Sequence, residues 1–163
     1  MFMHSMILSH ITYCLTTWSQ ASNTSLKSLL SLYKKTIKVL DRKSIYYHHC
    51  HVLKKYSLLN FENLIIYADL CLVYNILHGL APPVLCQFVR TAPNDHRSTR
   101  SVARGDCIIP LRKSALGQTA FSVRAAREWN LIPIHIRNFK TYPSFKLNLK
   151  KWLTGSQDCQ HYI

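Results

Sequence analysis

The stretch from Gly117 to Leu153, GQTAFSVRAAREWNLIPIHIRNFKTYPSFKLNLKKWL, decides the fold that this sequence predicts. Apolar residues recur every fourth position over 118–130, as in an amphipathic helix, at Phe121, Ala125 and Trp129. Pro133 disfavours helical conformation at the residue before it and so predicts a break at 131–133. Ser144 is expected to cap a second helix, whose lysines lie opposite its apolar face. The stretch therefore predicts two short helices with a basic outer surface.

A second amphipathic pattern covers 24–41 and is the most regular in the chain. Its apolar positions have helical spacing and are Leu26, Leu29, Leu30, Tyr33, Ile37 and Leu40. Its basic positions line the other side and are Lys27, Lys34, Lys35, Lys38 and Arg42. At about 1.5 Å per residue this row spans about 22 Å, which matches several successive phosphates of a nucleic-acid backbone. The row predicts a phosphate-contacting face, and a solvated helix surface is the alternative.

The charge balance of the whole chain favours a polyanionic partner. The 163 residues include 21 Lys and Arg against 7 Asp and Glu, a formal net charge of +14 at pH 7. Such an excess is the electrostatic footprint of nucleic-acid binding, and a merely basic, soluble surface is the alternative. Hydrophobic residues make up 48% of the chain, enough for the core of one domain and too many for a disordered tail.

The first 26 residues contain no Lys, Arg, Asp or Glu. Polar residues interrupt their apolar run and no basic segment precedes it, so the sequence predicts neither a signal peptide nor a membrane span. Residues 3–19 are expected to form a helix that packs against other protein, including protein outside this chain. This packing leads to the hypothesis that Met1 is an internal start within a longer ancestral reading frame. We expect an intracellular protein, nuclear or cytoplasmic, that is not secreted and not bound to a membrane.

The segment 41–55, DRKSIYYHHCHVLKK, places four metal-binding residue types side by side, at His48, His49, Cys50 and His51. Zinc ligands are normally separated by two or more residues, because consecutive side chains point in different directions. We therefore expect no metal site here, and expect the imidazoles to add positive charge below about pH 6.5. The six cysteines lie far apart without a CxxC pair and are predicted to be reduced thiols.

Residues 60–80 predict a central core helix, because the segment is apolar on nearly every side. It contains Tyr67-Ala68-Asp69, which resembles the catalytic signature of reverse transcriptases, a tyrosine and a variable residue followed by two aspartates. Position 70 is Leu, whereas two-metal catalysis needs paired carboxylates. No two of the chain's acidic residues are adjacent. We therefore assign no catalytic residue.

The segments between the core helix and the tail are expected to be short. Gly79 ends the core helix, and Pro82-Pro83 opens a short helix that ends near residue 90. A polar loop over 91–106 carries cations that can pair with phosphate, Arg97, Arg100 and Arg104. The predicted fold is mainly α, a small irregular bundle of about five to seven helices. At most one short strand or hairpin is expected, near 107–111.

The tail also carries a family resemblance. Its pattern consists of Phe121, Trp129-Asn130, Pro133, Ile136-Arg137, Phe145-Lys146, Leu149-Lys150 and Leu153. This pattern is similar to the C-terminal tail of reverse transcriptases from non-LTR retrotransposons of the LINE type, in particular Jockey-like elements. Ile132 stands where the family usually has leucine before the proline.

Shorter similarities to the same family run through the rest of the chain in the family's order. The segment Ser9 to Cys14, followed by Trp18, is similar to the start of the thumb, the helical region that follows the polymerase palm. Residues 32–40, LYKKTIKVL, resemble a Leu-Gln-Lys-Lys-Ala-Ile-Arg motif, with Tyr33 in place of glutamine. Further along, the family has a histidine and a Thr-Arg pair, matched here by His96, Thr99 and Arg100.

The resemblance implies the C-terminal part of an RNA-directed DNA polymerase. Fingers, palm and the Mg²⁺-binding aspartates would precede Met1, so we expect no cofactor and no polymerase activity from this chain alone. We expect four regions: a thumb-like region over 1–90, a basic linker over 91–116, a helical tail module over 117–153 and a flexible tail over 154–163. The missing polymerase domains, or another protein, would cover the uncharged helix over 1–20.

The expected function is nonspecific binding of RNA or DNA, such as an RNA–DNA duplex, through a basic helical face. The residues predicted to contact nucleic acid are Lys27, Lys34, Lys35, Lys38, Arg42, Arg97, Arg100, Arg104, Arg124, Arg127, Lys146, Lys150 and Lys151. The alternative is a helical protein–protein interaction module, in which the lysines only keep the chain soluble.

Overall fold

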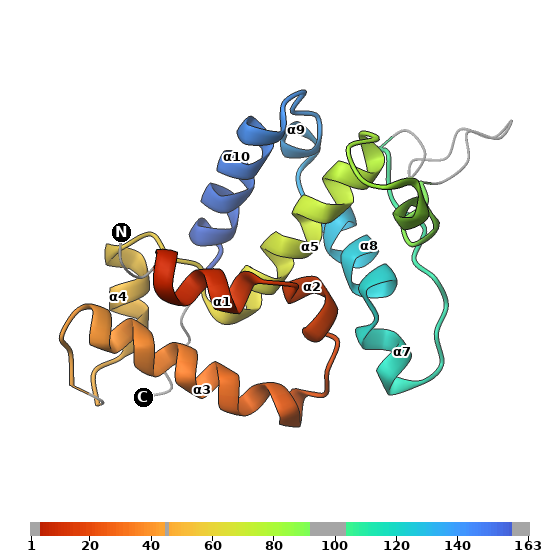
Figure 1. The fold of residues 1–163 in the computed structure, drawn as a ribbon. Helices are drawn as coiled ribbons and strands as arrows, with labels where there is room; N and C mark the ends of the chain where they lie inside the picture. The colour runs from red at the N-terminus through yellow and green to blue at the C-terminus, as the bar shows by residue number, and fades with distance from the viewer. Residues whose placement is uncertain (1–3, 45, 92–103, 158–163) are drawn as a thin grey trace, which may run out of the picture. The chain divides into compact units, whose positions relative to one another are not determined.

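The computed structural model describes residues 4–44, 46–91 and 104–157, and these residues are mainly helical (Figure 1). In chain order the helices are η1 (His4–Leu8), α1 (Ser9–Thr12), α2 (Leu15–Trp18), α3 (Asn23–Leu40), α4 (His49–Lys55), α5 (Phe61–Leu77), η2 (Pro83–Gln87), α7 (Ala115–Thr119), α8 (Phe121–Leu131), α9 (Ile134–Arg137) and α10 (Tyr142–Gly155). Within the described ranges the only β-type pairing is an isolated antiparallel bridge between Thr91 and Cys107. The predicted all-α class is therefore confirmed.

The chain divides into two compact units. Unit 1 comprises Met1–Ile65 with Lys150–Ile163, and unit 2 comprises Ile66–Leu149. Both boundaries fall inside helices, the first in α5 and the second in α10. The four regions expected from the sequence, 1–90, 91–116, 117–153 and 154–163, divide the chain differently and stay a prediction.

The first predicted helix, over 3–19, is broken at Tyr13 and Cys14, between α1 and α2. Cys14 adopts a left-handed backbone conformation with φ of 50°, which ends α1 and lets α2 begin in a new direction. The turn is held locally, because the Trp18 indole Nε1 donates a 2.9 Å hydrogen bond to the Tyr13 carbonyl. Breaks of this kind explain why the described helices outnumber the five to seven that we expected.

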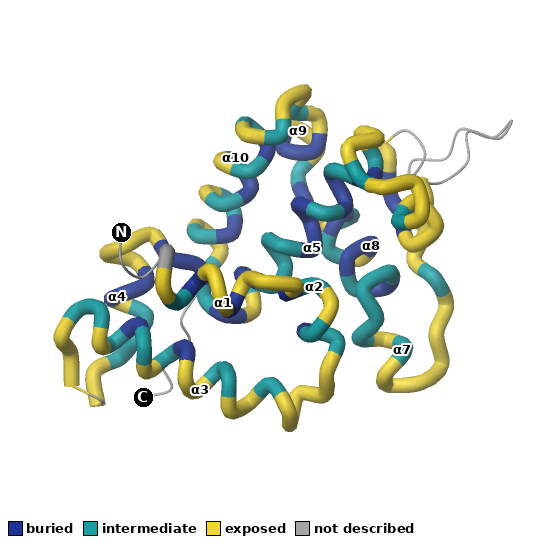
Figure 2. The backbone as a smooth tube through the Cα atoms, viewed as in Figure 1, coloured by how far each residue is buried: buried dark blue, intermediate teal, exposed yellow. Residues whose placement is uncertain are grey.

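Helix α3 follows its predicted range to within one residue at each end. The Ser22 hydroxyl caps its first turn by accepting a 3.2 Å hydrogen bond from the Ser25 amide. Along the helix, buried and exposed positions alternate with helical spacing (Figure 2). Tyr33 and Ile37 are fully buried, whereas the four predicted leucines of the stripe are half-buried.

Tyr33 anchors α3 in the core of unit 1. Its ring packs on Phe61 with centroids 5.8 Å apart, and its hydroxyl donates a 2.6 Å hydrogen bond to the Leu59 carbonyl. Burial raises the pKa of Tyr33 to about 12, so the hydroxyl remains a donor at neutral pH.

Replacing Tyr33 with phenylalanine is expected to lower the free energy of unfolding by about 1–3 kcal/mol. The phenylalanine keeps the ring packing but leaves the buried Leu59 carbonyl without its donor. Chemical denaturation measures the loss. Tyr46→Phe is the matched control, because Tyr46 is 91% exposed and should change stability by less than about 0.5 kcal/mol. Equal losses in the two variants would contradict the role given to the Tyr33 hydroxyl.

Helix α5 supplies the core of unit 2, as the apolar stretch over 60–80 predicted. It ends before Gly79, which has φ of +68°, and the Leu80 amide donates a 2.8 Å hydrogen bond back to the Asn75 carbonyl. The buried Tyr74 ring stacks on Phe145 with centroids 4.3 Å apart, and its hydroxyl donates to the Phe139 carbonyl at 2.8 Å. Trp129 packs on the other side of this cluster, 6.0 Å from Phe145.

The tail differs from its prediction at Ser144. Ser144 does not cap the second helix, because α10 begins at Tyr142 and Ser144 lies in its first turn, where its hydroxyl accepts from Thr141 at 2.8 Å. Near 107–111, where at most one short strand or hairpin is expected, the described residues form the single bridge at Cys107. No neighbouring strand is available there among the described residues, so the segment stays extended without a ladder.

Candidate nucleic-acid interface

The predicted cations divide between the two units. Unit 1 holds the row on α3 together with the end of α10, and these residues are Lys27, Lys34, Lys35, Lys38, Arg42, Lys150 and Lys151. Unit 2 holds Arg104, Arg124, Arg127 and Lys146. Arg97 and Arg100 lie outside the described residues, as do His96 and Thr99. The α3 row is therefore the largest set of predicted contacts that a single unit brings together.

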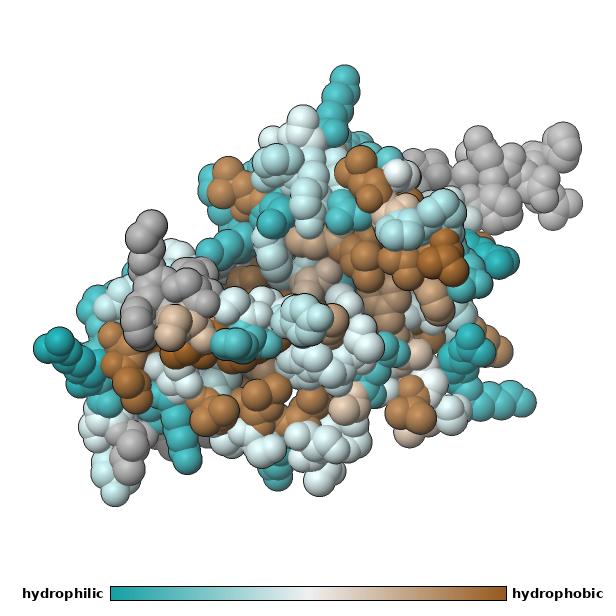
Figure 3. Space-filling view, viewed as in Figure 1, coloured by the Kyte–Doolittle hydropathy of each residue, from teal (hydrophilic) through white to brown (hydrophobic). Residues whose placement is uncertain are grey.

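The cations of α3 are accessible. Lys27, Lys35 and Arg42 are exposed and Lys34 and Lys38 are half-buried, and hydrophilic side chains project from the surface over α3 in Figure 3. Negative charge is scarce around them, because Asp41 and Glu62 are the acidic residues among the first 65. Asp41 is engaged by Lys55, whose Nζ lies 2.5 Å from its carboxylate, and by the Tyr56 hydroxyl at 2.9 Å. These hydrogen bonds lower the pKa of Asp41 and keep it ionised.

His49 lies beside this row at the start of α4. Its imidazole is partly buried, and burial, together with the charges of Lys34, His48 and Lys38, lowers its pKa to about 4. The expectation that this imidazole adds positive charge below about pH 6.5 is therefore wrong for His49. Lys34 and Lys38, which make the surface basic, therefore also oppose protonation of the nearby His49 imidazole.

The side chains of His48, His49 and Cys50 lie close together at the start of α4. The possible ligand atoms of His48, His49 and Cys50 lie within 4.8 Å of one another, closer than consecutive positions predicted. Cys50 is disulfide-bonded, however, so its sulfur is not the thiolate that zinc takes. The disulfide also contradicts the predicted thiol at this position, whereas Cys14, Cys71, Cys86 and Cys107 are free. Cysteine spacing in the sequence cannot show which sulfurs the fold brings together.

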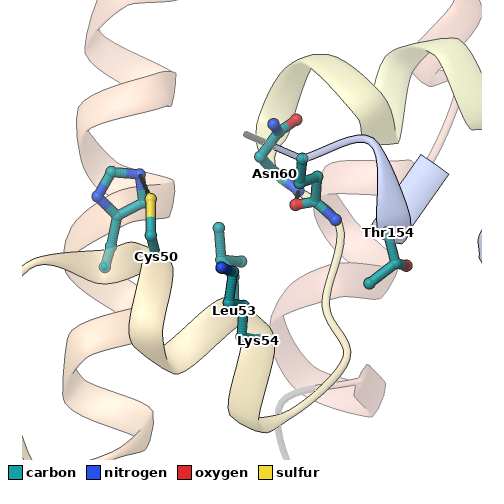
Figure 4. Close-up of a pocket in the computed structure, with 7 residues that line it drawn as sticks. Cys50, Leu53, Lys54, Asn60 and Thr154 are labelled. Atoms are coloured by element: carbon teal, nitrogen blue, oxygen red, sulfur yellow. Dashed lines mark hydrogen bonds between the residues drawn. The ribbon is translucent and has the colours of Figure 1, made fainter. Parts of the chain in front are cut away.

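Three cavities adjoin one another along α3 in unit 1. A cavity of about 430 Å³ is lined by Lys27 and Phe61, and one of about 130 Å³ by Lys34 and Phe61. The third, of about 100 Å³, shares His49 with the second and is shown in Figure 4, where Cys50, Leu53 and Lys54 of α4 lie on one side and Asn60 and Thr154 on the other. We call the three cavities together the α3 groove.

Arg124, one of the predicted contacts, is a structural residue. Its Nε lies 2.6 Å from Asp69 Oδ2, in an ion pair between α8 and α5 in which Asp69 is 0% exposed and Arg124 19%. Burial raises the pKa of Asp69 to about 6, although Arg124 lowers it, and Asp69 Oδ1 has no hydrogen-bond partner. Asp69 belongs to the Tyr67-Ala68-Asp69 sequence. Its carboxylate is enclosed in a helical core, where it cannot reach a substrate.

Arg137 and Asn130, two residues of the tail pattern, hold the segment before them in unit 2. Arg137 is 7% exposed and lies 2.8 Å from Asp106 Oδ1, and it also donates to the carbonyls of Ile132 and Asn130. The Asn130 amide accepts from the Cys107 N–H at 2.8 Å and donates to the Cys107 carbonyl at 2.9 Å. Arg104 pairs with the other Asp106 oxygen at 3.0 Å. These tail residues thus act in folding.

The other predicted cations have local partners or lie apart. Arg127 is exposed and donates to the Gln118 side chain at 3.0 Å, while the Lys146 ammonium lies 5.3 Å from the centre of the Tyr142 ring. Lys150 and Lys151 follow on α10, half-buried and exposed respectively. The groove beside α3 was not predicted from the sequence, because a cavity formed by several helices leaves no periodic signal in any one of them.

No protein-family model matches this chain, and neither the curated proteins nor the solved structures include a significant match. Among the described residues, no helix is both long enough and apolar enough to cross a bilayer. A function therefore has to be inferred from the chemistry of the chain's own residues.

Proposed function

We propose that this chain is the thumb and tail region of a reverse transcriptase of the non-LTR retrotransposon type, and that it binds nucleic acid through α3 without reading its sequence. The observation that carries the proposal is the accessible cation row on α3 in a unit that has few carboxylates. Lysines in a row position a phosphate backbone without distinguishing bases. The resemblance of the tail supports the choice of family, in which a palm domain carries polymerase catalysis and binds Mg²⁺.

The test is binding of a fluorescein-labelled RNA–DNA duplex, followed by anisotropy from about 50 to about 200 mM salt. We expect log affinity to fall linearly with log salt, with a slope of about −0.9 for each phosphate contact. Changing Lys34, Lys35 and Lys38 together to glutamate should flatten the slope by about 3.

A variant with the same change in charge controls for net charge. Three exposed cations of unit 2 are not predicted contacts, and these are Arg112, Lys113 and Lys140. Changing them together to glutamate should leave most of the slope of log affinity against log salt unchanged. Equal effects of the two triple variants would contradict a phosphate site on α3. DNA synthesis by this chain alone, given template, Mg²⁺ and nucleotides, would contradict the absence of a palm.

The second candidate is a protein interaction module, and the N-terminal segment favours it. This segment carries no charged residue, and two of its large apolar side chains are exposed, Met6 at 55% and Tyr13 at 77%. Exposed apolar side chains on an uncharged segment are typical of a docking surface. If folded protein does not bind the duplex at any salt concentration, this module becomes the better account.

A further inference from the structure

The lysines of α3 are not equivalent in their positions around the helix. Lys27, Lys34 and Lys38 follow one another at intervals of seven and four residues, so they lie within about 40° of one another around the axis. Lys35 lies about 100° from Lys34. The structure agrees with this geometry, because Lys27 and Lys34 line the α3 groove and Lys34 and Lys38 act electrostatically on His49. Neither Lys35 nor Lys38 lines the cavities described above, but Lys38 acts on His49, which lines two of them, whereas Lys35 is exposed on another side of the helix.

The largest cavity of the groove has the chemistry of a nucleotide site. Its apolar wall consists of Leu26, Leu30, Phe61 and Ile65. Its polar lining consists of Asn23, Thr24, Lys27 and Glu62. The volume of about 430 Å³ falls in the range of small-molecule sites, roughly 300–1,000 Å³. The apolar wall fits the faces of a nucleotide base, and the Lys27 ammonium fits its phosphate. The Glu62 carboxylate fits an amino group on the edge of that base.

The adjoining cavity continues this arrangement along α3. It shares Leu30, Phe61 and Glu62 with the first cavity and adds Lys34 and His49. At pH 7 the His49 imidazole is neutral, so it can donate or accept a hydrogen bond without adding charge. The groove therefore presents lysines along one edge and an apolar floor beneath them. A paired base is stacked inside a duplex and cannot enter such a cavity, whereas an unpaired base can.

We propose that the α3 groove binds a single strand of nucleic acid, with an unpaired base in the cavity lined by Phe61 and phosphates on Lys27, Lys34 and Lys38. The proposal rests on the proposed function, since it specifies the nucleic acid that the basic face of α3 takes. The Glu62 carboxylate accepts a hydrogen bond from an amino-bearing base such as adenine.

The probe is fluorescein-labelled oligoadenylate, used alone and paired with its DNA complement. The single strand is expected to bind about tenfold more tightly than the duplex, a difference of about 1.4 kcal/mol. Lys34→Glu should weaken binding of the single strand about tenfold and lower the salt slope by about 1, whereas Lys35→Glu, one residue away, should weaken it less than about twofold.

A third variant tests the cavity without changing charge. Thr24 is exposed where it lines the cavity, so Thr24→Trp fills the slot while leaving the buried core intact. We expect this variant to unfold at the wild-type temperature and to bind oligoadenylate about tenfold more weakly, with duplex binding unchanged.

The outcomes separate this proposal from the proposed function. Equal affinity for single strand and duplex, equal effects of Lys34→Glu and Lys35→Glu, or wild-type binding by Thr24→Trp would each overturn the groove proposal while leaving a phosphate-binding face on α3. If the folded wild-type protein bound neither the single strand nor the duplex in a salt-dependent way, the proposed function itself would be overturned.

Discussion

Replacing Arg137 with methionine is expected to lower the free energy of unfolding by about 3–5 kcal/mol. Methionine keeps the aliphatic length but removes the guanidinium that lies 2.8 Å from Asp106 Oδ1. The Asp106 carboxylate, which is 6% exposed, keeps the exposed Arg104 as a partner but loses its buried one, and the carbonyls of Ile132 and Asn130 lose a donor.

Urea denaturation followed by circular dichroism measures this effect. Arg127→Met is the matched control, because Arg127 is exposed and makes one hydrogen bond, to Gln118. It should cost less than about 1 kcal/mol. If Arg137→Met were as stable as Arg127→Met, the pair with Asp106 would not hold the segment before the tail.

Replacing Arg124 with methionine is expected to destabilise the protein in a pH-dependent way. At about pH 7.5 the Asp69 carboxylate would be left ionised and unpaired in the core, and we expect a loss of about 3–5 kcal/mol. At about pH 5 the same carboxyl group takes up a proton, and a neutral acid is much less costly to bury. The loss relative to wild type should therefore be much smaller at the lower pH.

The direction of this pH dependence follows from the raised pKa of Asp69. Its value of about 6 in the folded protein exceeds the ordinary value, so its contribution to stability is complete below about pH 4 and is lost as the pH rises through about 6. Without Arg124 the pKa rises further and the loss extends to higher pH. Glu128, whose pKa burial also raises, lies in the same environment. The double variant Asp69→Asn, Arg124→Met therefore serves as control, and a pH dependence that persists in it would assign the titration to Glu128 instead.

The regular parts of the fold could be predicted because their signals are local. The spacing of apolar residues located α3 and α5, and Gly79 marked the end of α5, where only glycine adopts positive φ at low cost. The break at Cys14 was not predictable in this way, because a non-glycine residue with φ of 50° is held by its surroundings rather than by its own preference.

The ion pairs that fix unit 2 could not be predicted from the sequence. Asp69 and Arg124 are 55 residues apart, and Asp106 and Arg137 are 31 apart. The periodicity of apolar residues does not indicate which distant cation forms an ion pair with a buried carboxylate. One signal was available, since an aspartate inside an otherwise apolar helix requires a partner.

The candidate site was predictable as a helix face but not as a groove. Periodicity placed five cations on and just after α3, yet it gave Lys34 and Lys35 equal weight. They differ because α4 and the first turn of α5 pack beside one side of α3, which creates the cavities next to Lys34. A helical wheel of α3 shows in which direction each side chain points. The neighbouring helices determine which of these directions faces a groove.

The pairing of Thr91 with Cys107 also matters for protein engineering. The Ile108 amide donates a 2.8 Å hydrogen bond to the Arg90 carbonyl beside this bridge, so both ends of the connection over 92–103 are already fixed. Doubling the length of a loop between fixed ends costs only about 0.6 kcal/mol. A reporter or affinity tag inserted between Thr91 and Cys107 is therefore expected to cost little stability, and it would interrupt the predicted contacts Arg97 and Arg100 rather than the lysines of α3.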